Sequence, residues 1–152
     1  MTGLKLLAAF GTFALLLNGC GTSKTAEIGL VNGSLRPCPD SPNCVSSMAT
    51  NADQHVEPFQ FQAAPGEAWE AANQAILKLP RTQIISSTDD YLHAESRSSV
   101  FGFVDDLELQ LLTEQRQIEI RSAARTGYYD LGVNRKRVEE LRGQLHTTAV
   151  GR

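Results

Sequence analysis

Two consecutive stretches near the middle of the chain alternate between apolar and polar residues, and this alternation constrains the fold more than any other feature. Leucines recur at every second position from 107 to 111, and Ile118 and Ile120 do the same in the next stretch. A period of two places successive side chains on opposite faces of a β-strand. With residues 114–116 as the turn, residues 104–112 and 117–123 predict a β-hairpin with one apolar and one charged face.

The remaining elements follow from changes of period along the chain. Pro65 suits the first turn of a helix, and Pro80 ends it. The elements expected besides the hairpin are strands over residues 55–62, 82–87 and 91–98, a helix over residues 65–79, and a last helix capped by Asn134 with Val138, Leu141 and Leu145 on one stripe. The proline-rich residues 35–47 are expected to form a stiff, structured loop.

The order strand, helix, four strands, helix indicates an α+β fold, in which an antiparallel sheet of about five strands carries both helices on one face. This order is compatible with a TATA-binding-protein-like or helix-grip topology. A chain of 152 residues with 41% hydrophobic content has room for one such domain, which we place at residues 35–147. Residues 148–152 are expected to form a disordered tail.

The first twenty residues have the layout of a lipoprotein signal peptide. Lys5 supplies a positive start, and the apolar run over residues 6–17 is too short to span a bilayer comfortably. The run ends in Leu17-Asn18-Gly19-Cys20, which resembles the lipobox of bacterial lipoproteins. An ordinary secretory signal or a short buried helix is the alternative interpretation. We therefore predict that residues 1–19 are removed and that Cys20 carries acyl chains such as palmitate.

An acylated Cys20 implies a lipid-anchored protein of the bacterial cell envelope that faces the periplasm without spanning the membrane. Gly21 stands where enterobacterial lipoproteins kept at the inner membrane have Asp, and this resemblance favours the outer membrane. Residues 20–34 are rich in Gly, Ser, Thr and Asn and are expected to form a flexible tether.

The charged face of the predicted hairpin brings carboxylates and arginines within pairing distance. If the leucines face the core, either allowed register places Glu108 beside or diagonal to Arg121, and Asp106 near Arg125. The simplest interpretation is a solvated face of cross-strand ion pairs, each worth less than about 1 kcal/mol. Asp105 and Asp106 point to opposite faces, so they do not form a converging catalytic dyad.

Three basic residues, Arg135, Lys136 and Arg137, lie in the first turn of the last helix, where the helix dipole disfavours cations. An anion should therefore lie near them. Inside the protein the candidates are Asp105, Asp106, Glu108 and Asp130. The alternative is a bound phosphate or carboxylate held by Arg121, Arg125, Arg135 and Arg137. The sequence does not distinguish an internal network from a ligand site.

Cys38 and Cys44 lie in the proline-rich segment. In an oxidising compartment, two cysteines so close together favour a disulfide. The alternative is a metal site or redox pair that recruits His55, although the spacing matches no standard zinc pattern. Since Cys20 is assigned to lipid, the odd number of cysteines requires no intermolecular bridge.

Several function classes find no support. The chain has no Gly-x-Ser-x-Gly elbow, phosphate-binding loop or His-Glu-x-x-His motif. Its net charge of −3, without a long run of like charge, does not indicate a nucleic-acid-binding protein. We expect no cofactor and no metal ion.

Three segments together resemble the domain-of-unknown-function family 1499, small bacterial and plastid proteins that are often lipoproteins or membrane-linked. These segments are residues 37–47, 102–108 and 121–135, and the resemblance extends from residue 35 to about residue 145. It implies no established activity. It does imply a set of motif positions: Cys38, Cys44, Asp105, Asp106, Glu108, Arg121, Ser122, Arg125, Asp130, Asn134 and Arg135. Ala124 and Thr126 flank Arg125 where the family usually has Ser and Val.

These observations support three hypotheses. The first is a non-enzymatic envelope lipoprotein whose Asp/Glu/Arg cluster is a polar network or binds a small anion or an envelope protein. The second is an enzyme on an envelope metabolite that uses Asp106, Glu108, Arg121 and Arg125. The third is a metal or redox lipoprotein that uses Cys38, Cys44 and His55.

Overall fold

The predicted hairpin forms the centre of the sheet. In the computed structural model, which describes residues 27–147, strands β7 (Val104–Leu112) and β8 (Gln117–Ala124) pair antiparallel. The register places Glu108 directly opposite Arg121 and Leu109 opposite Ile120. The hairpin and the separation of its two faces are therefore confirmed.

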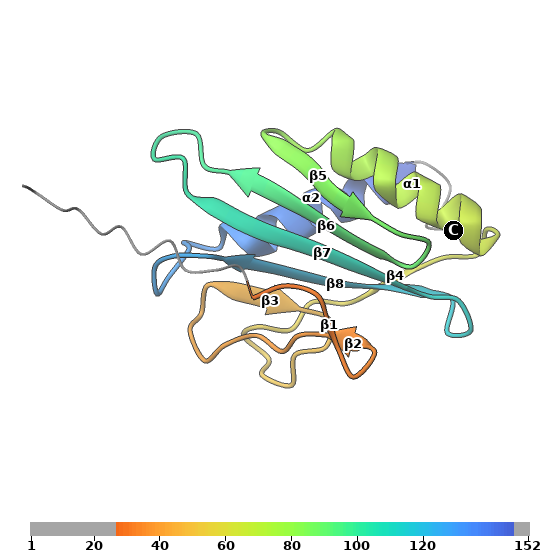
Figure 1. The fold of residues 1–152 in the computed structure, drawn as a ribbon, viewed down its shortest axis with the longest axis horizontal. Helices are drawn as coiled ribbons and strands as arrows, with labels where there is room; N and C mark the ends of the chain where they lie inside the picture. The colour runs from red at the N-terminus through yellow and green to blue at the C-terminus, as the bar shows by residue number, and fades with distance from the viewer. Residues whose placement is uncertain (1–26, 148–152) are drawn as a thin grey trace, which may run out of the picture.

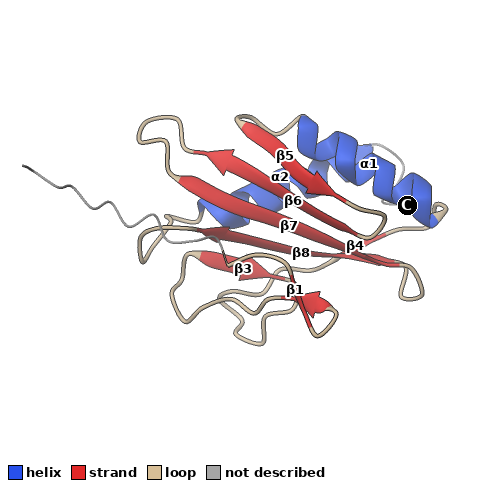
Figure 2. Ribbon diagram, viewed as in Figure 1, coloured by secondary structure: helices blue, strands red, loops and turns tan. Residues whose placement is uncertain are grey.

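Four further strands extend the sheet in the order β3-β8-β7-β6-β5, with β4 also paired to β8. They are β3 (Cys44–Ser46), β4 (Phe59–Gln60), β5 (Thr82–Ser87) and β6 (Tyr91–Arg97). Helices α1 (Pro65–Leu77) and α2 (Val133–Thr147) lie on one face of this sheet (Figures 1 and 2). The structure thus confirms an α+β fold with an antiparallel sheet and two helices packed against it.

The hydrophobic core lies between the helices and the sheet. The alternate residues of the hairpin supply one side of it, and the apolar stripes of the two helices supply the other: Leu107, Leu109, Ile118, Ile120, Trp69, Ile76, Val138 and Leu141. Trp69 of α1 also donates a hydrogen bond from Nε1 to the Thr88 carbonyl at 2.9 Å. The face of the sheet away from the helices is left to polar residues.

Two expectations about the first half of the chain need correction. Within the expected strand over 55–62, only residues 59–60 form a strand, and His55 adds an isolated bridge to Ser46 of β3. Pro58 interrupts the stretch because it has no N–H to donate to a ladder. The proline-rich loop instead contains β3, which pairs with the outer edge of β8 from Ala123 to Arg121. The short strands β3 and β4 therefore share one edge of β8.

The prediction of a flexible tether over residues 20–34 is wrong for its last residues, which form strands. Strands β1 (Leu30–Val31) and β2 (Ser34–Leu35) form a small hairpin on the polar face of the sheet. Gln110 of β7 donates from Nε2 to the Gly33 carbonyl at 2.8 Å and holds this hairpin in place. The predicted signal peptide, Cys20 and the C-terminal tail lie outside the described residues. Within residues 27–147, no helix is both long and apolar enough to cross a membrane.

Asn134 is not the residue that caps α2. The helix begins at Val133, and Asp130 caps it by accepting hydrogen bonds from the Asn134 N–H at 2.8 Å and the Gly132 N–H at 3.0 Å. Asp130 is favoured in this place because its carboxylate also complements the positive end of the helix dipole. The Asn134 side chain is fully buried and accepts hydrogen bonds from Ser122 and Arg137 instead.

Candidate functional site

The charged face of the sheet is buried rather than solvated. The side chain of Glu108 is 0% exposed and that of Arg121 is 4% exposed, although both point away from the helices. Residues 27–44 cover them, beginning with the Gly29 N–H, which donates to Glu108 Oε1 at 2.7 Å. The expectation of a solvated face of weak ion pairs is therefore wrong, because a segment distant in the sequence removes this face from water.

Glu108 is the centre of the first polar cluster, which also contains Arg121 and Tyr91. Arg121 donates from Nη1 to Glu108 Oε2 at 2.7 Å, and the Tyr91 hydroxyl donates to Oε1 at 2.8 Å. Burial, and then the hydrogen bond to Glu108, raise the pKa of Tyr91 above its ordinary value. Both carboxylate oxygens of Glu108 are thus hydrogen-bonded.

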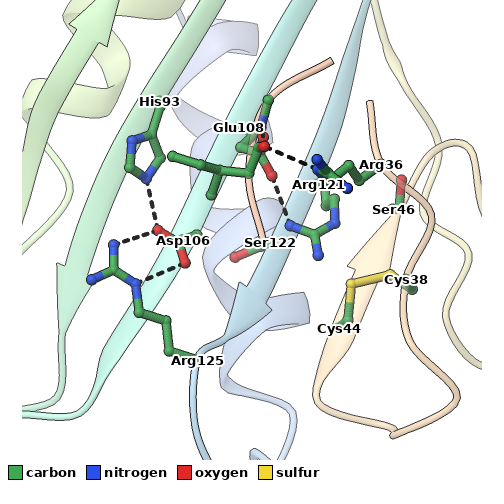
Figure 3. A network of polar contacts seen from close by, with 12 residues as sticks. Arg36, Cys38, Cys44, Ser46, His93, Asp106, Glu108, Arg121, Ser122 and Arg125 are labelled. Atoms are coloured by element: carbon green, nitrogen blue, oxygen red, sulfur yellow. Dashed lines mark hydrogen bonds and ion pairs between the residues drawn. A yellow bond between two sulfur atoms is a disulfide. The ribbon is translucent and has the colours of Figure 1, made fainter. Parts of the chain in front are cut away.

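Asp106 is the centre of the second polar cluster, beside the first on the same face (Figure 3). Arg125 contacts it in a bidentate manner, with Nε 2.9 Å from Oδ2 and Nη2 2.7 Å from Oδ1. His93 donates from Nε2 to Oδ1 at 2.7 Å, and Arg125 also pairs with Glu95. Burial raises the pKa of Asp106, but the hydrogen bonds from His93 and Arg125 outweigh it and hold this pKa below its ordinary value. The hydrogen bond to Asp106 in turn raises the pKa of Arg125.

A third cluster lies on the opposite face of the sheet, beneath α2. Arg137 donates from Nη2 to Asp105 Oδ2 at 2.6 Å and from Nη1 to Asn134 Oδ1 at 2.6 Å. Ser122 donates to the same Asn134 oxygen, also at 2.6 Å. Asp105 is therefore the internal anion expected near the first turn of α2. Arg135 instead donates to the carbonyls of His55 and Asp53, at 2.9 and 2.8 Å.

The predicted residues therefore do not form one cluster, because the sheet separates them. Asp106, Glu108, Arg121 and Arg125 lie on one face, whereas Asp105, Asp130, Asn134, Arg135 and Arg137 lie on the helix side. The separation of Asp105 from Asp106 agrees with the prediction from alternation. This arrangement excludes the hypothesis that Arg121, Arg125, Arg135 and Arg137 all bind one anion, because they lie on two faces of the sheet.

A pocket of about 680 Å³ opens over the charged face. Three arginines line it, Arg36, Arg121 and Arg125, together with Asp106 and Asn43. The Nε atom of Arg121 is buried and has no hydrogen-bond partner among the described residues. Arg36 donates from Nε to the Ile28 carbonyl at 3.0 Å, and its two Nη groups make no hydrogen bond within the described part of the chain.

The polar clusters and the pocket also contain three residues that the sequence did not predict: Arg36, Tyr91 and His93. Tyr91 and His93 are two residues apart on β6 and therefore share a face of the sheet. The alternation that predicts the charged face of β7 could have predicted their position as well. Arg36 had no such signal, because it lies in an irregular segment that approaches the sheet only in the folded chain.

Cys38 and Cys44 form the predicted disulfide, with a Cα–Cα distance of 5.7 Å. This bond joins Cys38 to the first residue of β3, as Figure 3 shows. His55 directs Nδ1 to the Ala49 carbonyl at 3.1 Å. Among residues 27–147, no three His, Cys, Asp or Glu side chains are grouped to hold a metal ion.

Fold and site together define a small α+β domain with a buried polar cluster pair on one face of its sheet and a mainly apolar core on the other. The chain belongs to the family described as "Protein of unknown function (DUF1499)", whose model matches residues 34–145. The match spans β2 through most of α2 and so includes all three clusters and the disulfide. No curated protein matches the chain in sequence.

Proposed function

We propose that this protein is a lipid-anchored binding protein of the bacterial envelope, whose pocket takes a small molecule with a carboxylate or phosphate group. The observation that carries the proposal is a pocket lined by Arg36, Arg121 and Arg125, in which the buried Nε of Arg121 has no hydrogen-bond partner among the described residues. A buried donor without a partner costs about 1–3 kcal/mol. A bound oxyanion would remove that cost.

The geometry of guanidinium groups supports an oxyanion as the ligand. Arginine presents its N–H groups in a planar fork that matches carboxylate and phosphate oxygens. Arg36 adds two Nη groups that are free within the described chain, and it enters from the covering segment rather than from the sheet. The pocket can thus offer donors from two sides.

The same contacts argue against catalysis by Asp106 and Glu108. Both oxygens of each carboxylate already accept hydrogen bonds from the protein. The lowered pKa of Asp106 keeps this carboxylate ionised, which makes it a poor general acid or base near neutral pH. Binding is therefore favoured over the enzyme hypothesis. The disulfide favours it over a metal site at Cys38 and Cys44, because sulfurs bonded to each other are not free thiolate ligands.

Thermal shift and calorimetry with inorganic phosphate and with succinate test the proposal. We expect saturable binding of at least one anion to the purified protein. In Arg36→Gln this binding should weaken at least tenfold, because Arg36 contributes to the pocket and makes no bond of its own to Asp106 or Glu108 within the described chain. Lys136→Gln is the matched control, since Lys136 is an exposed cation outside this pocket. Absence of binding to both anions, or equal weakening in the control, would refute the proposed function.

Membrane anchoring through Cys20 is a separate part of the proposal. Its support is the apolar run that ends in the lipobox-like residues 17–20. Mass spectrometry of protein from membranes should find a chain that begins at an acylated Cys20. A Cys20→Ser variant that still yields a processed, membrane-bound chain would overturn this assignment.

A further inference from the structure

Two loops at one end of the sheet carry large apolar side chains that do not enter the core. The first joins β6 to β7, and the second joins β8 to α2. Their exposed members, with relative exposure, are Val100 (79%), Phe101 (76%), Phe103 (56%), Tyr128 (72%), Tyr129 (62%) and Leu131 (83%). We call these six residues the apolar tip. Scattered surface apolar residues are ordinary, but a group of this kind indicates a contact surface.

The two loops project from the same end of the molecule. The Ser98 N–H donates to the Phe103 carbonyl and closes the first loop. The Arg125 N–H donates to the Val104 carbonyl, so the second loop begins where the first one ends. Figure 1 shows both loops at the end of the sheet opposite to the β7–β8 turn. Within the apolar tip, the rings of Phe101 and Phe103 have centroids 5.5 Å apart.

Basic residues lie beside the apolar tip. A second hollow of about 270 Å³ is lined by Arg81, Arg97, Lys136 and Arg137. Two carboxylates, Asp105 and Glu140, also line it. Asp105 is paired with Arg137, and the exposed Arg97 is paired with Glu95 at 3.0 Å. Aromatic and aliphatic side chains next to exposed cations are the composition that suits the interface of a bilayer with anionic headgroups.

The described chain begins at this end of the domain. Glu27 lines the pocket over the charged face together with Ala124, Arg125 and Gly127, the residues that lead into the second loop. The predicted acylation site, Cys20, lies seven residues before Glu27. Seven extended residues span at most about 25 Å. An anchor at Cys20 is therefore close enough to this end of the domain for the end to reach the membrane.

We propose that the apolar tip docks into the interfacial region of the bilayer that holds the lipid anchor. This inference rests on the proposed anchoring. Val100, Phe101 and Tyr128 enter among the headgroups, while Arg81, Arg97 and Lys136 meet the lipid phosphates. Docking fixes the orientation of the domain and places the opening of the anion pocket close to the membrane surface.

Depth-dependent quenching in the full chain tests this inference. The protein is reconstituted into vesicles of phosphatidylethanolamine and phosphatidylglycerol that contain brominated acyl chains. Phe101→Trp is the reporter, and Gln115→Trp, on the turn at the opposite end of the sheet, is the matched control. Trp69 is the single native tryptophan and is 8% exposed, so it adds the same background to both variants.

We expect the emission of Phe101→Trp to shift to shorter wavelength and to be quenched several-fold more than that of Gln115→Trp. Equal quenching of the two variants, in protein that floats with the vesicles, would overturn docking while leaving the anchor intact. Protein that does not float with vesicles would overturn both. A wavelength shift that appears without vesicles and grows with protein concentration would assign the surface to a second copy of the chain, also against docking.

Discussion

Glu108→Gln is expected to destabilise the domain more than Arg121→Met does, although the two side chains share one ion pair. Removing one partner of a buried pair costs about 3–5 kcal/mol, because the other charge stays buried and unpaired. In Glu108→Gln the remaining charge is Arg121, which is 4% exposed. The full cost therefore applies.

Arg121→Met differs for two structural reasons. Glu108 keeps its hydrogen bonds from the Gly29 N–H and the Tyr91 hydroxyl. The substitution also deletes the buried Nε, whose unsatisfied state costs about 1–3 kcal/mol. We therefore expect a loss near 2 kcal/mol, or about half that of Glu108→Gln. For a domain of this size, Glu108→Gln corresponds to a fall in Tm of roughly 10–20 °C.

Urea unfolding followed by circular dichroism at neutral pH, in buffer without phosphate or carboxylate, measures both losses. The double variant should lose less than the two single losses added together, because it leaves no buried charge. Arg97→Met is the matched control: Arg97 pairs with Glu95 at 3.0 Å but is 58% exposed, so its loss should stay below about 1 kcal/mol. A loss for Glu108→Gln no larger than that of the control would refute the buried network. A larger loss for Arg121→Met than for Glu108→Gln would refute the role given to Nε.

Three further predictions concern the disulfide, the Tyr91 hydroxyl and the cap of α2. Replacing Cys38 and Cys44 together by Ser should lower the free energy of unfolding by about 2 kcal/mol, as closure of a short loop implies, and equal urea midpoints would contradict this. The pKa of Tyr91 lies above its ordinary value of 10.0 in the folded state, so its contribution is complete below that pH and is lost as the pH rises further. Tyr91→Phe should therefore be less stable at pH 9 yet show a smaller decline by pH 11, and parallel declines in urea unfolding would count against it. Asp130→Ala should cost about 1 kcal/mol through loss of the cap of α2, whereas Asp130→Asn should restore most of it.

Alternation was enough to predict which residues share a face of the sheet. The opposition of Glu108 and Arg121, the proximity of Asp106 to Arg125, and the separation of Asp105 from Asp106 all follow from a period of two and a short turn. These relations are local. They involve residues that are adjacent in the sequence or lie on the two strands of one hairpin. The sequence pattern is therefore enough to predict them.

Contacts between distant segments decided the rest. The same alternation is compatible with a solvated or a buried charged face. The face is buried because Gly29 lies on top of it, although Gly29 is 79 residues before Glu108 in the chain. Arg36 also reaches the pocket through a contact between distant segments, and no periodic pattern in the sequence predicts its position. Burial converts ion pairs that would contribute little in water into a network whose parts are costly to separate, because the missing water can no longer solvate either charge. The sequence by itself determined which residues of the central hairpin pair with one another. The tertiary structure added Arg36 to them, buried their charges and formed the pocket.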